Sequence, residues 1–177
     1  NDPQAVANFA YYPLRRLEAE VLIDAINAIT GTTDLYTSAI PEPFTYIPQD
    51  QPAIALADGS ITSPFLALFG RSPRATGLAN ERNNDLDSSQ WLHLLNSSHI
   101  QTKLERGANL RAIVATRRKP QAIVEELYLT ILSRFPTPDE LKNLQGYSGA
   151  KTRTMRRDQW VDVSWALMNS TEFLFRH

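Results

Sequence analysis

Three arginines and one acid between residues 71 and 82 come nearest, by type and spacing, to a binding site. Arg71 and Arg74 belong to a Phe-Gly-Arg-Ser-Pro-Arg element at 69–74, and Glu81 and Arg82 follow it. Guanidinium groups gathered by a tight turn can grip a carboxylate, sulfate or phosphate through paired hydrogen bonds. They can equally pin a polar loop by pairing with Glu81 or with helix C-terminal carbonyls. The structural role is the favoured interpretation, and an anion- or acidic-sugar-binding site is the alternative.

A second group of polar residues follows in the sequence Gln-Trp-Leu-His-Leu-Leu-Asn at 90–96. Asp87 or Ser88 can cap a helix there, which places Gln90 in its first turn. We expect His93 to be a partly buried polar residue beside Asn96. Together with the arginine element, these residues form one candidate site along an exposed groove.

The histidines do not form a recognisable metal or catalytic motif. His93 and His99 are six residues apart, which is not a spacing that puts both on one face of a helix. The chain has no Gly-x-Ser-x-Gly nucleophile motif and no glycine-rich phosphate loop. We therefore expect no metal and no cofactor in this segment. The missing motifs favour a domain that is not an enzyme, with catalysis left open.

Acids before the predicted helix support one catalytic alternative. Paired carboxylates can hydrolyse glycosides when they face each other across a cleft. In this alternative the chain is a hydrolase or carbohydrate-active domain, with Glu81 and Asp85 as the acids and Arg71 or Arg74 as the substrate clamp. It requires a concave pocket in which at least two carboxylates converge.

The composition is that of one ordinary globular domain covering residues 1–177. The chain is 42% hydrophobic and 21% charged, with 18 basic and 19 acidic residues and a net charge of -1. Such a balance argues against binding to nucleic acid or to an anionic membrane across the whole domain. The absence of cysteine excludes disulfides, thiolate zinc sites and covalent haem attachment within this segment. No apolar run is long enough for a transmembrane segment, and the start at Asn1 suggests an excised piece of a larger protein.

Apolar residues at helical spacing predict an all-α fold, an irregular bundle of five or six helices. The predicted helices cover residues 14–30, 89–105, 110–116, 120–134, 137–146 and 158 onward, with a brief helical turn at 65–69. Thr137 and Glu140 form a predicted capping box, and the helices on either side of Pro136 form an αα-hairpin.

The first predicted helix has charged residues on the side away from the core. We expect Glu20 and Asp24 in solvent there, with Arg16 pairing with Glu20 at a gain of a few tenths of a kcal/mol. Gly31 is positioned to end the helix.

Five prolines make residues 32–64 an irregular insertion in the bundle. Phe44, Tyr46 and Ile47 are expected to anchor it as an ordered loop draped over the core. The only strand signal, at 53–62 around Asp58 and Gly59, allows one small β-hairpin.

Several motifs resemble one known family along nearly the whole chain. They are Arg-Arg-Leu at 15–17, Thr-Gly at 30–31, Phe-Gly-Arg-x-Pro-Arg at 69–74, Glu-Arg at 81–82, Gln-x-Leu-x-Leu-Leu-Asn at 90–96, Glu-Leu-Tyr-Leu to Pro-x-Glu-Leu at 126–141, and Trp-Ala-Leu-x-Asn-Ser-x-Glu-Phe at 165–173. On these motifs the chain resembles the planctomycete PSD-one domain family, domain of unknown function fifteen fifty-three. Many relatives have Cys-x-Cys-Glu-Arg where residues 78–82 here are Leu-Ala-Asn-Glu-Arg, so both thiols are missing.

The resemblance implies a C-terminal domain of a large exported bacterial protein, periplasmic or at the cell surface. Its neighbours would be another uncharacterised domain and often a haem-binding segment, which leaves a redox accessory as a third hypothesis. The family has no established catalytic residues to carry over. The leading hypothesis is an uncharacterised, non-catalytic interaction or scaffolding domain. Its partners would be other domains of the same polypeptide or a surface protein, with an acidic or carbohydrate ligand as a further option, and no nucleic acid.

Overall fold

The computed structural model describes residues 8, 10, 14–57, 59–72, 82–83, 87–115, 118–147 and 155–176. These residues form a mostly helical bundle, as predicted from the sequence. The bundle also contains two short antiparallel strand pairs. No helix among them has the length and hydropathy that crossing a bilayer requires.

Helix α2 (Ala19–Thr30) contributes Leu22, Ile23 and Ile26 to the centre of the core, where all three are almost completely buried. It ends at Gly31, as predicted, with a left-handed backbone that lets the Gly31 N–H donate to the Asn27 carbonyl. A side chain at Gly31 would also collide with Asn109, which approaches it from another helix. Glycine therefore both ends α2 and permits a close helix contact.

The predicted helical start at residue 14 is wrong. Strand β1 (Arg15–Arg16) instead pairs antiparallel with β4 (Phe175–Arg176) at the end of the described chain. The Leu17 N–H continues the contact by donating to the Leu174 carbonyl at 2.8 Å. Pairing with a distant segment thus outweighs the local helical pattern.

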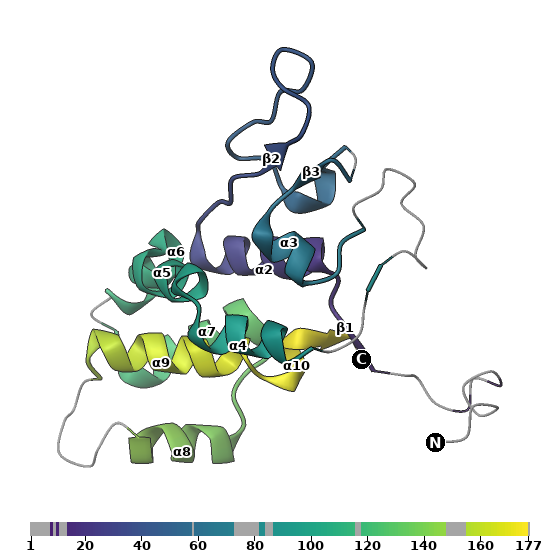
Figure 1. Cartoon of the computed structure of the whole chain (residues 1–177). Coiled ribbons are helices and arrows are strands. Elements are labelled where there is room, and N and C mark those ends of the chain that lie inside the picture. The colour runs from purple at the N-terminus through teal and green to yellow at the C-terminus, as the bar shows by residue number, and fades with distance from the viewer. Residues whose placement is uncertain are drawn as a thin grey trace.

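The remaining helices follow in chain order around α2. They are α3 (Pro64–Leu68), α4 (Ser88–Asn96), α5 (Ser98–Arg106), α6 (Ala108–Val114), α7 (Pro120–Leu132), α8 (Pro138–Tyr147), α9 (Arg157–Met168) and α10 (Thr171–Leu174). Figure 1 shows α7 and α9 packed together beneath α2, with α8 at the edge of the molecule. Helix α8 has no fully buried residue, in agreement with this peripheral position.

The predicted helix at 89–105 is two helices, because the backbone leaves the helical region at Ser97. Ser97 ends α4, and its hydroxyl oxygen accepts the Ile100 N–H at 3.2 Å to cap α5. The capping box predicted at the start of α8 is confirmed. The Thr137 N–H donates to Glu140 at 2.7 Å, and the Glu140 N–H donates back to the Thr137 hydroxyl at 3.3 Å.

The proline-rich insertion is fixed at its base and projects beyond it. Strands β2 (Thr37–Ser38) and β3 (Ile61–Thr62) form an antiparallel pair, so the small strand pair is not a hairpin within 53–62. The short helix η1 (Ala53–Ala55) lies on α2, where the Asp24 carboxylate accepts the Ala53 and Ile54 N–H groups at 2.7 and 2.9 Å. Asp24 therefore has a structural role that its expected place in solvent did not suggest. Asp58, at the predicted hairpin turn, lies outside the described residues.

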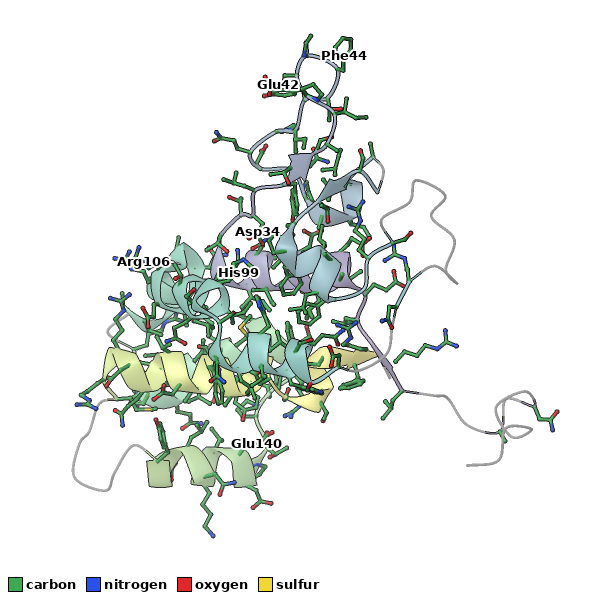
Figure 2. The ribbon with its side chains drawn as sticks, viewed as in Figure 1. Asp34, Glu42, Phe44, His99, Arg106 and Glu140 are labelled. Carbon is green, nitrogen blue, oxygen red and sulfur yellow. The ribbon has the colours of Figure 1, made fainter. Side chains whose placement is uncertain are left out.

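We call residues 39–52, between β2 and η1, the finger. It rises away from the helices, with Phe44 near its tip (Figure 2). Of the three residues expected to anchor the insertion, only Ile47 packs against the core. Phe44 is 83% exposed and Tyr46 is 75% exposed, so the prediction that they anchor it is wrong.

Candidate functional site

The predicted arginines meet a buried acid of α2. Arg71 Nε lies 3.0 Å from Glu20 Oε1, and Arg82 binds both carboxylate oxygens, with Nη1 at 2.7 Å from Oε2 and Nη2 at 2.9 Å from Oε1. The Glu20 side chain is only 4% exposed. We call Glu20, Arg71 and Arg82 the arginine clamp, because they tie the segment after α3 onto α2.

Glu20 was expected in solvent with Arg16 as its partner, and that expectation is wrong. The Arg16 guanidinium turns elsewhere, with Nη2 donating to the Phe69 carbonyl at 2.9 Å and its centre 4.9 Å from the Phe69 ring. Spacing within the predicted helix at 14–30 put Arg16 and Glu20 within reach of each other. It could not show that Arg71 and Arg82, more than 50 residues away, would take the carboxylate.

The electrostatics of the clamp favour the ionised pair. Burial alone would raise the pKa of the Glu20 carboxyl, but the hydrogen bond and charge of Arg82, with the charge of Arg71, hold it below its usual value. The same hydrogen bond raises the pKa of Arg82. Arg71 also donates through Nη1 to the Ile61 carbonyl, which extends the clamp to β3. The clamp therefore uses both Glu20 oxygens for internal contacts.

Gln90 links α4 to the end of α3. Its side chain is buried, and Nε2 donates to the Leu68 carbonyl at 3.1 Å. Beside it, Phe65 and Phe69 stack with ring centroids 4.2 Å apart. The Phe69 ring contacts Arg16 on one side and the His93 ring, 6.1 Å away, on another. The stacked rings thus lie between Arg16 and a second polar cluster that contains His93.

That second cluster contains His93 of α4 and His99 of α5, and Figure 2 labels His99 with Asp34 beside it. His93 Nε2 lies 3.4 Å from His99 Nδ1, and His99 Nε2 lies 2.8 Å from Asp34 Oδ1. Lys103 Nζ approaches the same carboxylate at 3.2 Å and also donates to Asn27 Oδ1 at 2.7 Å. Six-residue spacing predicted separate histidines on a continuous helix. The break at Ser97 turns the two rings toward each other.

The surroundings lower the pKa values of three groups in this cluster, Asp34, His93 and Lys103. Burial would raise the pKa of Asp34, but His99 and Lys103 outweigh it and hold the pKa below its usual value. Burial lowers the pKa of His93, and the charge of His99 lowers it further. Burial also lowers the pKa of Lys103, with partial compensation from Asp34.

The cluster links polar side chains of α4, α5 and the loop after α2. Among the described residues, no group of three or more histidines and acids is placed to hold a metal ion. Asp34 and Lys103 had no motif that could identify them from sequence, because their contacts depend on the loop that follows α2.

The predicted site residues are only partly brought together. Arg71 and Arg82 share Glu20, and Gln90 and His93 lie near the Phe65–Phe69 stack. Asn96 is exposed at the last turn of α4. The predicted residues Arg74 and Glu81 lie outside the described residues, as does Asp85 of the hydrolase alternative.

A family model, PSD1, described as a protein of unknown function (DUF1553), matches residues 1–148. The match contains the arginine clamp, Gln90 and both histidines of the cluster, and it ends before α9. No curated protein and no solved structure matches the chain.

Proposed function

This chain belongs to the PSD1 family of proteins of unknown function, and from that premise we propose that it is a non-catalytic interaction or scaffolding domain. It would be one part of a larger exported bacterial protein. Its partner would be another domain of the same polypeptide or a protein of the cell surface.

The exposed finger is the observation that carries this proposal. Three large apolar side chains of the finger are exposed to solvent. They are Phe44, Tyr46 and Ile40, of which Ile40 is 45% exposed. Apolar side chains gathered on one exposed element are typical of protein contact sites, and aromatic residues commonly provide their central anchors. The base of the finger is fixed by the β2–β3 pair and by the Asp24 contacts to η1, so the helical body presents it in one place.

The arginine clamp supports the non-catalytic part of the same proposal. Arg71 and Arg82 were the best candidates for binding an anionic substrate, and the guanidinium groups of both donate hydrogen bonds to Glu20. A clamp already occupied by an internal carboxylate stabilises the fold and leaves little binding capacity for a ligand.

Photo-crosslinking in the intact parent protein tests the proposal. Benzoylphenylalanine at position 44 should give adducts with another domain or with a surface protein. The matched control is the same replacement at Phe135, a 65% exposed phenylalanine on the helical body. Equal or absent crosslinking at the two positions would refute a role for the finger.

Turnover separates this proposal from the hydrolase alternative. The purified chain should not hydrolyse a polysaccharide or ester library. If it does, and if Glu81→Gln or Asp85→Asn removes the activity, the domain is a hydrolase and the non-catalytic proposal is wrong.

A further inference from the structure

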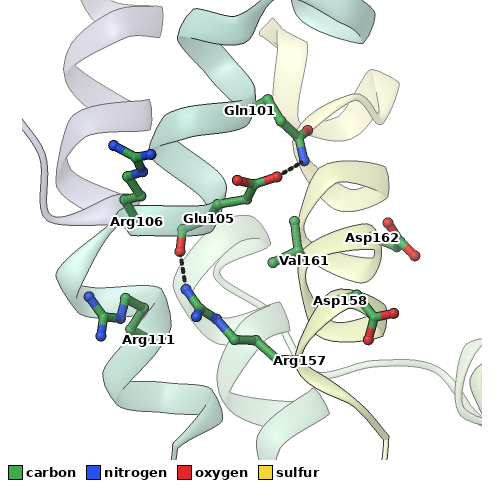
Figure 3. A pocket seen from close by; sticks show the side chains of 8 residues that line it. All are labelled: Gln101, Glu105, Arg106, Arg111, Arg157, Asp158, Val161 and Asp162. Carbon is green, nitrogen blue, oxygen red and sulfur yellow. Dashed lines mark hydrogen bonds between the residues drawn. The ribbon is translucent and has the colours of Figure 1, made fainter.

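A groove lies between α5, α6 and α9 (Figure 3), and none of its described lining residues belongs to the finger or to the arginine clamp. Its volume is 710 Å³, and charged side chains provide most of its lining. Val161 is the only apolar side chain among the described residues that line it, and none of them is aromatic. The groove is therefore a polar surface feature with no stacking platform.

Three arginines from three helices meet at this groove. Arg106 is the last residue of α5, Arg111 lies in α6 and Arg157 opens α9. Arg157 Nη2 donates to the Glu105 carbonyl, which holds its guanidinium against the end of α5. The guanidinium groups of Arg106 and Arg111 make no hydrogen bond or ion pair within the part of the chain that the structure describes.

Those two arginines differ from most of the other arginines that the structure describes. Arg71 and Arg82 pair with Glu20, Arg118 pairs with Glu126, and Arg134 bridges Glu140 and Glu172. Positive charge near a helix C-terminus is favourable in itself, which accounts for arginines in the last turns of α5 and α6. It does not account for their opening onto one groove beside a third arginine from α9.

The acids of the groove make hydrogen bonds or ion pairs with residues other than Arg106 and Arg111. Glu105 Oε1 accepts from Gln101 Nε2 at 2.7 Å, Asp158 pairs with Arg156 at 2.9 Å, and Asp162 accepts from the Tyr147 hydroxyl at 2.7 Å. In Figure 3 the side chains of Asp158 and Asp162 lie on the α9 side, away from Arg106 and Arg111. The wall from α5 and α6 is thus mainly positive, and the α9 wall carries two acids beside Arg157.

We propose that this groove binds a peptide segment of mixed charge. Acidic side chains of the peptide would meet Arg106 and Arg111, and a basic side chain would meet Asp158 or Asp162. The guanidinium groups of Arg106, Arg111 and Arg157 occupy separate positions along the groove (Figure 3), which suits successive carboxylates better than a single small anion. An acidic polysaccharide fits less well, because it would face Asp158 and Asp162 of α9, and none of the described residues that line the groove is aromatic and could stack on a sugar.

Peptide selection on the whole 177-residue chain tests this inference, which does not depend on the role of the finger. A random display library would be selected on the wild-type chain and counter-selected on an Arg106→Glu/Arg111→Glu variant. The enriched peptides should contain both acids and bases. Each single change, Arg106→Gln or Arg111→Gln, should weaken their binding about tenfold, since it removes one charged hydrogen-bonding partner. Binding should also weaken as salt is added.

The matched control is Arg15→Gln, which removes an exposed arginine on β1, outside the groove. It should bind the selected peptides as the wild type does, and circular dichroism should show that all variants keep their helices. The inference is overturned if no enriched peptide depends on Arg106 and Arg111. It is also overturned if the enriched peptides are uncharged or if polygalacturonate displaces them at a lower concentration than the free peptide does.

Discussion

At the scale of single residues, the arginine clamp places three charges where an unpaired one would be costly. Glu20 is buried, and Arg71 is nearly so, with its side chain 9% exposed. Removing one member of a buried charge pair usually destabilises more than the pair itself stabilises, because the remaining charge loses its partner. We therefore interpret the clamp as the element that fixes the segment after α3 onto α2.

Glu20→Gln should lower the free energy of unfolding by about 3 kcal/mol, because it leaves both arginines facing a neutral amide. Urea denaturation measures the change. Glu42→Gln, the same replacement at an exposed residue of the finger, is the control and should leave the midpoint unchanged. Equal stability of the two variants would show that the clamp does not support the fold.

His93 should make stability depend on pH in a defined window. Its pKa lies below the ordinary value of 6.5, so below about pH 6.5 the unfolded chain binds more protons than the folded chain does. The contribution of neutral His93 to the free energy of unfolding should be complete above about pH 6.5. It should decline as the pH falls through the lowered pKa.

Urea denaturation across pH checks this, with His93→Gln as the comparison. The variant should lose the decline that begins near pH 6.5. It should keep a second decline at lower pH, where Glu20 and Asp34, whose pKa values are both lowered, take up protons. Parallel profiles for the two proteins around pH 6 would contradict the placement of His93.

Sequence could identify one side of each residue contact but not the other. The arginine element at 69–74 and Glu81-Arg82 stood out by type and spacing, and a structural role for them was the favoured interpretation. Glu20 had the wrong assignment because a helix pattern reports only neighbours three and four residues away. Asp34 and Lys103 depend on how the chain folds back after α2, which local spacing does not encode.

At the scale of elements, local signals set helix ends correctly where a cap was present. Gly31 ends α2, and the Thr137–Glu140 box opens α8. The β1–β4 pair could not be predicted in this way, because its partners come from opposite ends of the chain. The break between α4 and α5 has a local cause in Ser97, but apolar residues continue at helical spacing on both sides and conceal it.

Ser97→Ala should cost about 1 kcal/mol, since it removes the hydroxyl that caps α5. The matched control is Ser98→Ala, at an exposed position in the first turn of the same helix. Thermal unfolding should separate the two variants. If both melt like the wild type, the cap does not hold the break, and another contact must set the angle between the histidines.

At the scale of the whole molecule, the helical bundle serves as a support for two separate surfaces. The finger rises on one side of α2, and the charged groove lies between α5, α6 and α9. The all-α class and most helix positions could be predicted from sequence. The exposed finger could not, because Phe44 and Tyr46 are residue types that usually anchor a loop by burial.

Accessibility of Phe44 in the larger exported protein that we propose tests the central claim most directly. The chain has no cysteine, so Phe44→Cys and Phe135→Cys each place a single thiol in it. Maleimide should modify position 44 quickly in the isolated chain and markedly more slowly in the intact parent protein in its cellular setting, while position 135 reacts equally in both. If position 44 reacts equally fast in both settings, nothing covers the finger, and the domain does not act through it.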